Sequence, residues 1–124
     1  MTATDTTAST LLAAIDISKY RHEVLIGVPG KKRRRRLTVT NTLEDFKRLS
    51  TALASYGLPV RIGFEATGNY HRTLAHHLGR AGFDLKLVSS VGLARTREAL
   101  HNSWDKNDPK DAQVILHMLE IGAV

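Results

Sequence analysis

The sequence predicts an α/β fold in which a mixed sheet of five strands carries helices on its faces. Three observations lead to this class. A chain of 124 residues has room for one domain with one core. Five short apolar or alternating segments have the length and composition of strands, and four segments repeat apolar residues at helical spacing. The helices begin only after the third strand, which is typical of a mixed sheet rather than a fully parallel one.

The first three predicted strands follow one another through short turns. Residues 11–17, LLAAIDI, form a nearly continuous apolar run, which indicates a strand buried on both faces. Strands over about 23–28 and 34–40 follow, with a turn at Pro29-Gly30 between them. These three strands should form an antiparallel meander. Residues 1–10 lack any apolar period, and we expect a disordered lead-in there.

Helices and strands alternate in the rest of the chain. The expected elements are helix 41–57, strand 60–65, helix 66–82, strand 83–88 and helices over about 91–100 and 109–119. Asn41 is the predicted N-cap of the first helix, with Glu44 three residues on, and Gly57 its end. Strands reached through a helix should run parallel to a neighbour. This element order is that of the ribonuclease H-like fold.

The positive charge of the chain is concentrated in one run. The sequence has 18 Lys and Arg against 12 Asp and Glu, a net charge of +6. The surplus equals the contiguous Lys31, Lys32, Arg33, Arg34, Arg35 and Arg36. Such a local field favours a polyanion, either nucleic acid or an anionic membrane surface. The alternative is a solvated hairpin tip that aids solubility.

Several classes of protein are excluded by composition. The chain has no cysteine, which excludes disulfide scaffolds, thiolate zinc sites and cysteine nucleophiles. No stretch approaches the roughly 18–20 apolar residues of a membrane span. The N-terminus lacks the basic start and apolar middle of a signal peptide. We therefore expect a cytoplasmic protein with no membrane partner.

Four acids occupy positions that could converge. Asp16 interrupts the first apolar strand, where an ionised carboxylate is costly unless cations or donors compensate it. Glu65 ends the fourth strand, and both carboxylates would emerge at one edge of the sheet if that strand lies beside the first. Asp108 and Asp111 share a face at the start of the last helix. The alternatives are a surface role for Glu65 and helix capping for the Asp108 and Asp111 pair.

Converging acids suit phosphodiester chemistry. Two magnesium ions about 3.5–4 Å apart can neutralise charge on the transferring phosphoryl group and hold the reacting oxygens in line. Hard divalent cations take oxygen ligands, so a pair of ions requires three or four carboxylates. Manganese is the alternative ion. The remaining acids, Glu23 among them, are interpreted as surface, cap or turn residues.

Three motifs carry a family resemblance. AIDISK around Asp16, FEATGNY around Glu65 and KNDPKDA around Asp108 and Asp111 together resemble the N-terminal domain of DEDD-type insertion-sequence transposases, whose catalytic domain is similar to the Holliday-junction resolvase RuvC. The resemblance runs from about residue 12 to 122. It implies that these four acids are a catalytic, magnesium-binding tetrad. It also implies an RNA-guided DNA recombinase in which a bridge RNA specifies target and donor DNA, acting at the bacterial nucleoid.

The resemblance covers only part of such transposases. Family members continue into a second domain that supplies a serine nucleophile and much of the homo-oligomer contact, and no segment of this chain resembles it. We therefore expect residues 11–124 to be the RuvC-like half, which does not recombine DNA alone. None of its own serines is assigned as the nucleophile.

Two other functions remain open at this point. In a non-catalytic RNA- or DNA-binding module, the basic hairpin is the function and the acids are caps. With catalytic acids instead, the basic run would contact nucleic acid beside them, and Lys19, Arg95, Arg97 and Lys106 are weaker candidates. A 3′–5′ exonuclease also uses four acids, but it requires two acids one residue apart on the first strand. Here Asp16 is followed by Ile17 and Ser18.

Overall fold

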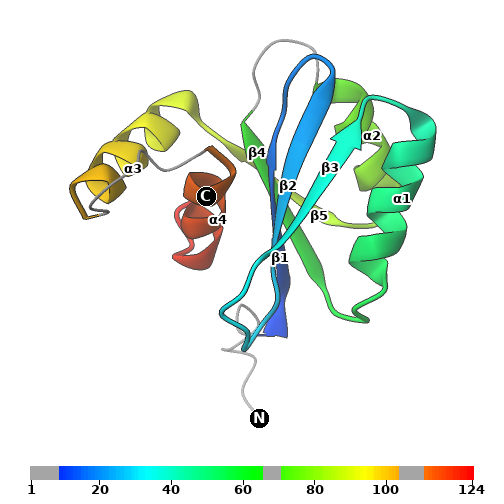
Figure 1. Ribbon diagram of the computed structural model, residues 1–124, viewed down its shortest axis with the longest axis horizontal. Coiled ribbons are helices and arrows are strands. Elements are labelled where there is room, and N and C mark those ends of the chain that lie inside the picture. Colours follow the sequence, from blue (N-terminus) through cyan, green and yellow to red (C-terminus); the bar gives the residue numbers. More distant parts are fainter. Residues whose placement is uncertain (1–8, 66–70, 104–110) are drawn as a thin grey trace.

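A computed structural model describes residues 9–65, 71–103 and 111–124 of the chain. The described elements are β1 (Leu11–Asp16), β2 (Arg21–Gly27), β3 (Arg35–Thr40), α1 (Leu43–Ala54), β4 (Val60–Glu65), α2 (His71–Arg80), β5 (Asp84–Val88), α3 (Ser90–Ser103) and α4 (Asp111–Glu120). The predicted α/β class is confirmed (Figure 1). Most of the predicted lead-in, residues 1–8, lies outside the described residues.

The five strands form one mixed sheet in the order β3-β2-β1-β4-β5. β1 pairs antiparallel with β2, and β2 antiparallel with β3. β4 lies between β1 and β5 and runs parallel to both. The predicted meander and the predicted parallel crossovers are therefore confirmed, and this strand order is that of the ribonuclease H-like fold.

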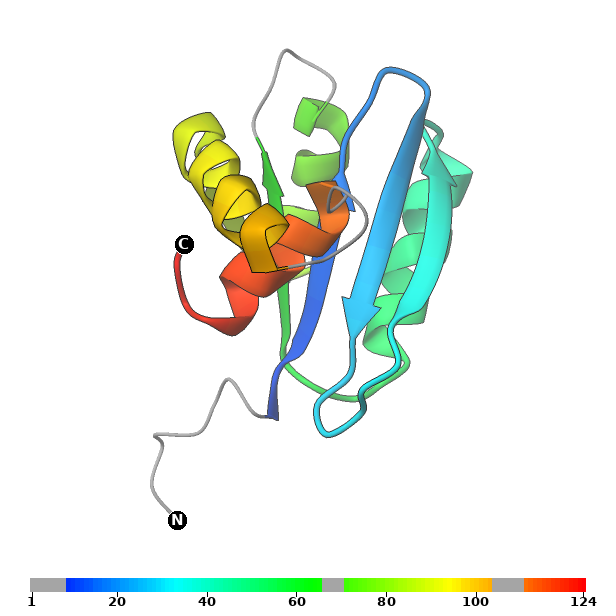
Figure 2. The ribbon, with the colours of Figure 1, turned by 60° about the vertical axis from the view of Figure 1, so that its left-hand side comes forward.

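β1 lies in the middle of the sheet and is buried on both faces. Its alternate residues Leu11, Ala13 and Ile15 belong to the core beneath α1 and α2. Leu12 and Ala14 belong to a second core, to which α3 and α4 contribute. Figures 1 and 2 show α1 and α2 on one side of the sheet and α4 on the other, with α3 outside α4. This two-sided burial explains the continuous apolar run in the sequence.

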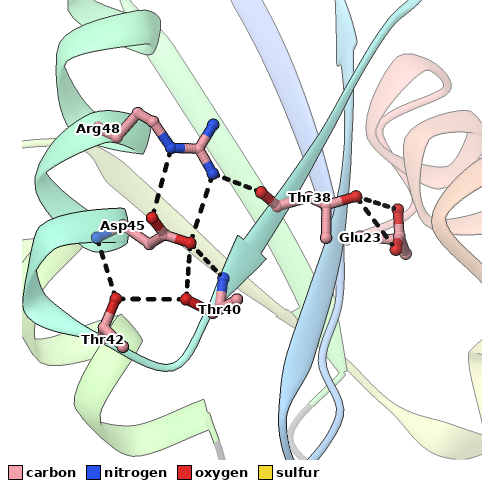
Figure 3. Close-up of polar contacts among 6 residues, drawn as sticks. All are labelled: Glu23, Thr38, Thr40, Thr42, Asp45 and Arg48. Carbon is pink, nitrogen blue, oxygen red and sulfur yellow. Dashed lines mark hydrogen bonds and ion pairs between the residues drawn. The ribbon is translucent and has the colours of Figure 1, made fainter.

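The N-cap of the first helix lies one residue later than predicted. Thr42, not Asn41, is the N-cap of α1, and its hydroxyl accepts a hydrogen bond from the Asp45 N–H at 3.2 Å. The Asp45 carboxylate accepts bonds from the N–H and the hydroxyl of Thr40, both at 2.7 Å (Figure 3). Asp45 thus ties the helix start to the end of β3, and this tertiary contact decides between two residues that can both cap.

α4 packs closely on the sheet because β4 has a glycine beneath it. A Cβ atom on Gly63 would lie only 3.0 Å from the Cδ atoms of Leu119, which is fully buried. α4 contacts β1, β2 and β4. This seat fixes the position of Asp111, the first residue of α4. Among the described helices, none is both long and apolar enough to cross a bilayer.

Candidate functional site: a row of acids beneath α3 and α4

Asp16 and Glu65 lie side by side at the ends of neighbouring strands. Ile15 of β1 is in register with Phe64 of β4, and Asp16 and Glu65 are the next residues of these two parallel strands. The charge of Glu65 also acts on Asp16. Neighbouring strands are about 4.8 Å apart, and residues in register point to the same face. That face is the one covered by α4, because Ala14 and Gly63, two residues earlier, both lie there. The condition for the two carboxylates to emerge at one edge, that the fourth strand lies beside the first, is met.

Glu23 adds a third carboxylate to this row. It is in register with Asp16 across β1 and β2, and with Thr38 across β2 and β3. The Thr38 hydroxyl donates to the Glu23 carboxylate, with oxygen–oxygen distances of 3.2 and 3.4 Å (Figure 3). The sequence predicts a surface, cap or turn position for Glu23. It is exposed, but the register of β2 against β1 also puts it beside Asp16, and spacing along the chain does not encode that register.

Asp16 is electrostatically unfavourable in its charged form. Burial raises the pKa of Asp16 above its ordinary value of 3.8, and the like charges of Glu23 and Glu65 raise it further. The Arg97 guanidinium on α3 acts in the opposite direction. The uncompensated negative charge in this row is what a bound cation would neutralise.

Asp111 reaches the same neighbourhood from α4, and Arg97 holds it there. The Arg97 guanidinium forms an ion pair with the Asp111 carboxylate, and both side chains are partly buried. The same guanidinium acts on Asp16. Arg97 therefore lies between two of the predicted tetrad acids. The sequence had suggested it only as a weak nucleic-acid contact.

The predicted tetrad is therefore only partly described. Asp108 lies outside the described residues. Within residues 9–65, 71–103 and 111–124, no group of three or more acidic or histidine side chains lies close enough together to hold a metal ion. The donor chemistry nevertheless suits magnesium, since carboxylate oxygens are its preferred ligands and Asp16 has Glu23 and Glu65 near enough to raise its pKa, after the larger effect of burial. The assignment of the four acids stays a prediction.

The side chains of the basic run, residues 31–36, differ in their surroundings. Arg34 forms an ion pair with Glu120 of α4, and Arg35 donates to the Tyr56 hydroxyl at 3.1 Å. Lys31, Lys32 and Arg33 lie exposed in the β2–β3 connection. Arg36 lies on β3, also exposed. The strand alternation and these contacts divide a run that is continuous in sequence into residues with different surroundings.

The fold and the acid row together define a ribonuclease H-like domain with an acidic site at the ends of β1 and β4. A family model described as a transposase, the DEDD type of the IS110 group, matches residues 13–123. The chain belongs to this family of transposases, and is a transposase or recombinase domain.

Other comparisons are more distant. The crystal structure of an exopolyphosphatase from Cytophaga hutchinsonii is similar to the chain with 15% identity and a TM-score of 0.44. The similar region covers 71% of this chain and 36% of the exopolyphosphatase, so the chain spans about a third of the length of that protein. A comparison with curated proteins gave no match.

Proposed function

We propose that this chain is the metal-dependent, RuvC-like catalytic domain of a DNA transposase. Asp16, Glu65, Asp108 and Asp111 would hold two magnesium ions, with manganese as the alternative. The observation that supports the proposal most is that Asp16 and Glu65 end adjacent parallel strands, on the face covered by the helix that begins at Asp111. Bound ions would supply charge neutralisation for phosphodiester cleavage and strand exchange.

The chain's own residues have distinct tasks in this proposal. Asp16 and Glu65 hold their carboxylates on a rigid sheet edge, which keeps the oxygen ligands preorganised. Arg97 serves as their counter-ion on the α3 side and orients Asp111. Basic side chains of residues 31–36 contact nucleic-acid phosphates, which provides affinity and register without sequence choice.

The remaining parts of the reaction belong to the complete transposase. Resemblance to the family suggests a structured bridge RNA that selects target and donor DNA, a serine nucleophile from a second domain, and a homo-oligomer that assembles both. On this proposal the domain by itself does not recombine DNA. The complete protein would work in the bacterial cytoplasm, on the nucleoid.

Magnesium titration tests the metal site directly. We expect saturable shifts of the amide and carboxyl resonances of Asp16, Glu65 and Asp111 in NMR spectra of the chain, followed by manganese-induced broadening of the same signals. Asp16→Asn should abolish both effects. The matched variant Asp45→Asn removes the same charge at the start of α1, outside the acid row, and should leave both effects unchanged. Equal shifts in the Asp16→Asn variant would contradict the proposed site.

A non-catalytic nucleic-acid-binding module is the second candidate. The exposed Lys31, Lys32 and Arg33 side chains, which make no ion pair with a described residue, favour it. In that case oligonucleotide binding would be independent of magnesium and unchanged by Asp16→Asn, and no metal-induced resonance shifts would be observed. The same two measurements therefore separate the candidates.

A further inference from the structure

A groove runs along α4 from the acid row toward the end of the helix. Its first part is a cavity of about 330 Å³ whose lining includes Asp16, Glu23, Arg36 and Gln113. The second part, about 370 Å³, includes Arg34 and His117 in its lining and shares Arg36 and Gln113 with the first. The two cavities adjoin, because Arg36 and Gln113 line both, and together they follow α4 on the side of strands β2 and β3.

Arg36 is the basic residue at the junction of these cavities. It is in register with Leu25 of β2 and lines both parts of the groove. Two carboxylates, Asp16 and Glu23, line the same cavity, yet none of the ion pairs among the described residues involves the Arg36 side chain. Its guanidinium is therefore available to a ligand.

The neighbouring arginines are already engaged. Arg34 pairs with Glu120 across the far end of the groove, which joins the β2–β3 hairpin to α4. Arg35 points to the other face of the sheet, where it donates to Tyr56. Arg36 thus combines a position in the groove with an uncommitted charge, which neither neighbour does.

We propose that this groove is the path of a nucleic-acid strand that extends from the acid row, and that Arg36 is the positioning residue that holds a backbone phosphate in it. The inference rests on the proposed function and deepens it. A guanidinium presents a planar fork that matches two phosphate oxygens. The acid row repels a phosphate backbone, and Arg97 is already paired with Asp111. Arg36 supplies a cation on the β3 side of the same cavity without forming an ion pair with the acids.

The test compares two arginines of the same run. Arg36→Gln and Arg33→Gln remove the same charge, but only Arg36 lines the groove. Fluorescence anisotropy measures the binding of short, fluorescein-labelled single-stranded DNA and of RNA with the same sequence. We expect Arg36→Gln to weaken binding by about 10-fold for at least one strand type, the scale of a charge-assisted hydrogen bond. Arg33→Gln should weaken binding by about 2-fold.

Comparing DNA with RNA identifies which nucleic acid binds in the groove, and equal losses for Arg36→Gln and Arg33→Gln would overturn the proposal. A larger loss for DNA assigns the groove to a DNA strand, and a larger loss for RNA assigns it to the guide. Equal losses in both variants would show that the run acts only as a diffuse positive charge, and no loss in Arg36→Gln would show that the groove is not the path. Arg36→Lys should recover part of the affinity, since charge remains but the fork is lost.

A second measurement does not depend on Arg36 variants. The chain has no cysteine, so one introduced thiol can carry a photo-crosslinker at a single position. Gln113→Cys in the groove should crosslink to bound oligonucleotide, whereas Thr51→Cys on the α1 face should not. Crosslinking from position 51 alone would overturn the proposal. If these tests contradict the groove while the Asp16 resonances still respond to magnesium, the groove alone is refuted and the proposed metal site is not.

Discussion

Two aspartates, Asp45 in the first turn of α1 and Asp16 at the end of β1, have opposite electrostatic surroundings in this fold. At the start of α1, the hydroxyl and N–H of Thr40 and the guanidinium of Arg48 lower the pKa of Asp45 to about 2. At the end of β1, burial and the charges of Glu23 and Glu65 raise the pKa of Asp16 instead. The carboxylate of Asp45 receives hydrogen bonds from donors, whereas that of Asp16 is partly buried beside like charges.

This contrast separates a stabilising acid from a costly one. A carboxylate that receives hydrogen bonds to its charged form favours the folded state at neutral pH. A carboxylate held among other acids opposes folding, and a protein keeps such a residue where function requires it. The comparison therefore supports a functional role for Asp16 on energetic grounds, independent of any family resemblance.

The largest expected difference is in catalysis. Asp16→Asn should reduce DNA cleavage by the complete transposase by about 1000-fold or more, because a ligand to the ions that stabilise the transferring phosphoryl group is lost. Asp45→Asn should change cleavage by less than about 3-fold, as expected for a surface contact. Cleavage of labelled DNA measures both rates. Substantial cleavage by a folded Asp16→Asn protein would remove Asp16 from the site.

A change beneath α4 should disturb the acid row while sparing Asp45. Gly63→Val places a side chain against Leu119, which a Cβ atom alone would approach to 3.0 Å. We expect a loss of about 2 kcal/mol in the free energy of unfolding, the usual cost of overpacking. Urea denaturation measures it. If Leu119→Ala in the same chain fails to relieve the loss, the close approach is not its cause.

Removing the charge of Asp16 and removing the charge of Asp45 should change the free energy of unfolding in opposite directions. Without divalent cations, Asp16→Asn should raise the free energy of unfolding by about 1 kcal/mol, because like-charge repulsion and the burial of a charge are removed. Asp45→Asn should lower it, because the donors of Thr40 lose their charged acceptor. Thermal and urea unfolding in a chelating buffer give both values. Destabilisation by Asp16→Asn would imply that its carboxylate has stabilising partners.

Asp45 and Asp16 should also make opposite contributions to the pH dependence of the free energy of unfolding. The pKa of Asp45 in the folded protein is about 2, below its ordinary value of 3.8, so its stabilising contribution is present above pH 3.8 and is lost as the pH falls toward 2. The stability difference between wild type and Asp45→Asn should therefore shrink over that interval. The raised pKa of Asp16 predicts the reverse, since acid relieves its repulsion. Carboxyl ¹³C titrations measure both pKa values. A pKa of Asp45 above 3.8, or a pKa of Asp16 below 3.8, would contradict the prediction.

The smallest expected effect concerns Arg97. Its guanidinium pairs with Asp111 and acts on Asp16, so it competes for the charge that a divalent cation would bind. Arg97→Gln should tighten manganese binding by about 3-fold, the scale of a partly exposed ion pair. Calorimetric titration of the metal-free chain measures the constant. Weaker binding would instead mean that Arg97 acts mainly to orient Asp111.

Much of the architecture was predictable because it depends on local periodicity. The apolar run around Asp16 indicated a central strand, and β1 is buried on both faces. The predicted end of the fourth strand at Glu65 coincides with the end of β4. Helix boundaries were less exact, since α1 is capped by Thr42 rather than Asn41. That difference arises from the contact of Asp45 with Thr40, which is formed only when β3 and α1 meet.

By itself, the sequence determined the order of the elements, the burial of the central strand and the placement of Asp16 and Glu65 at strand ends. These properties follow from residue spacing along one continuous segment. Only the tertiary structure decided that Glu23 joins the acid row and that Arg97 pairs with Asp111. It also decided that Arg34 and Arg36 line the groove, that Arg34 is paired with Glu120 there, and that Arg35 lies on the other face of the sheet. The physical reason is that strand register and contacts between distant segments are set by packing of the whole sheet and its helices, and no local pattern encodes them.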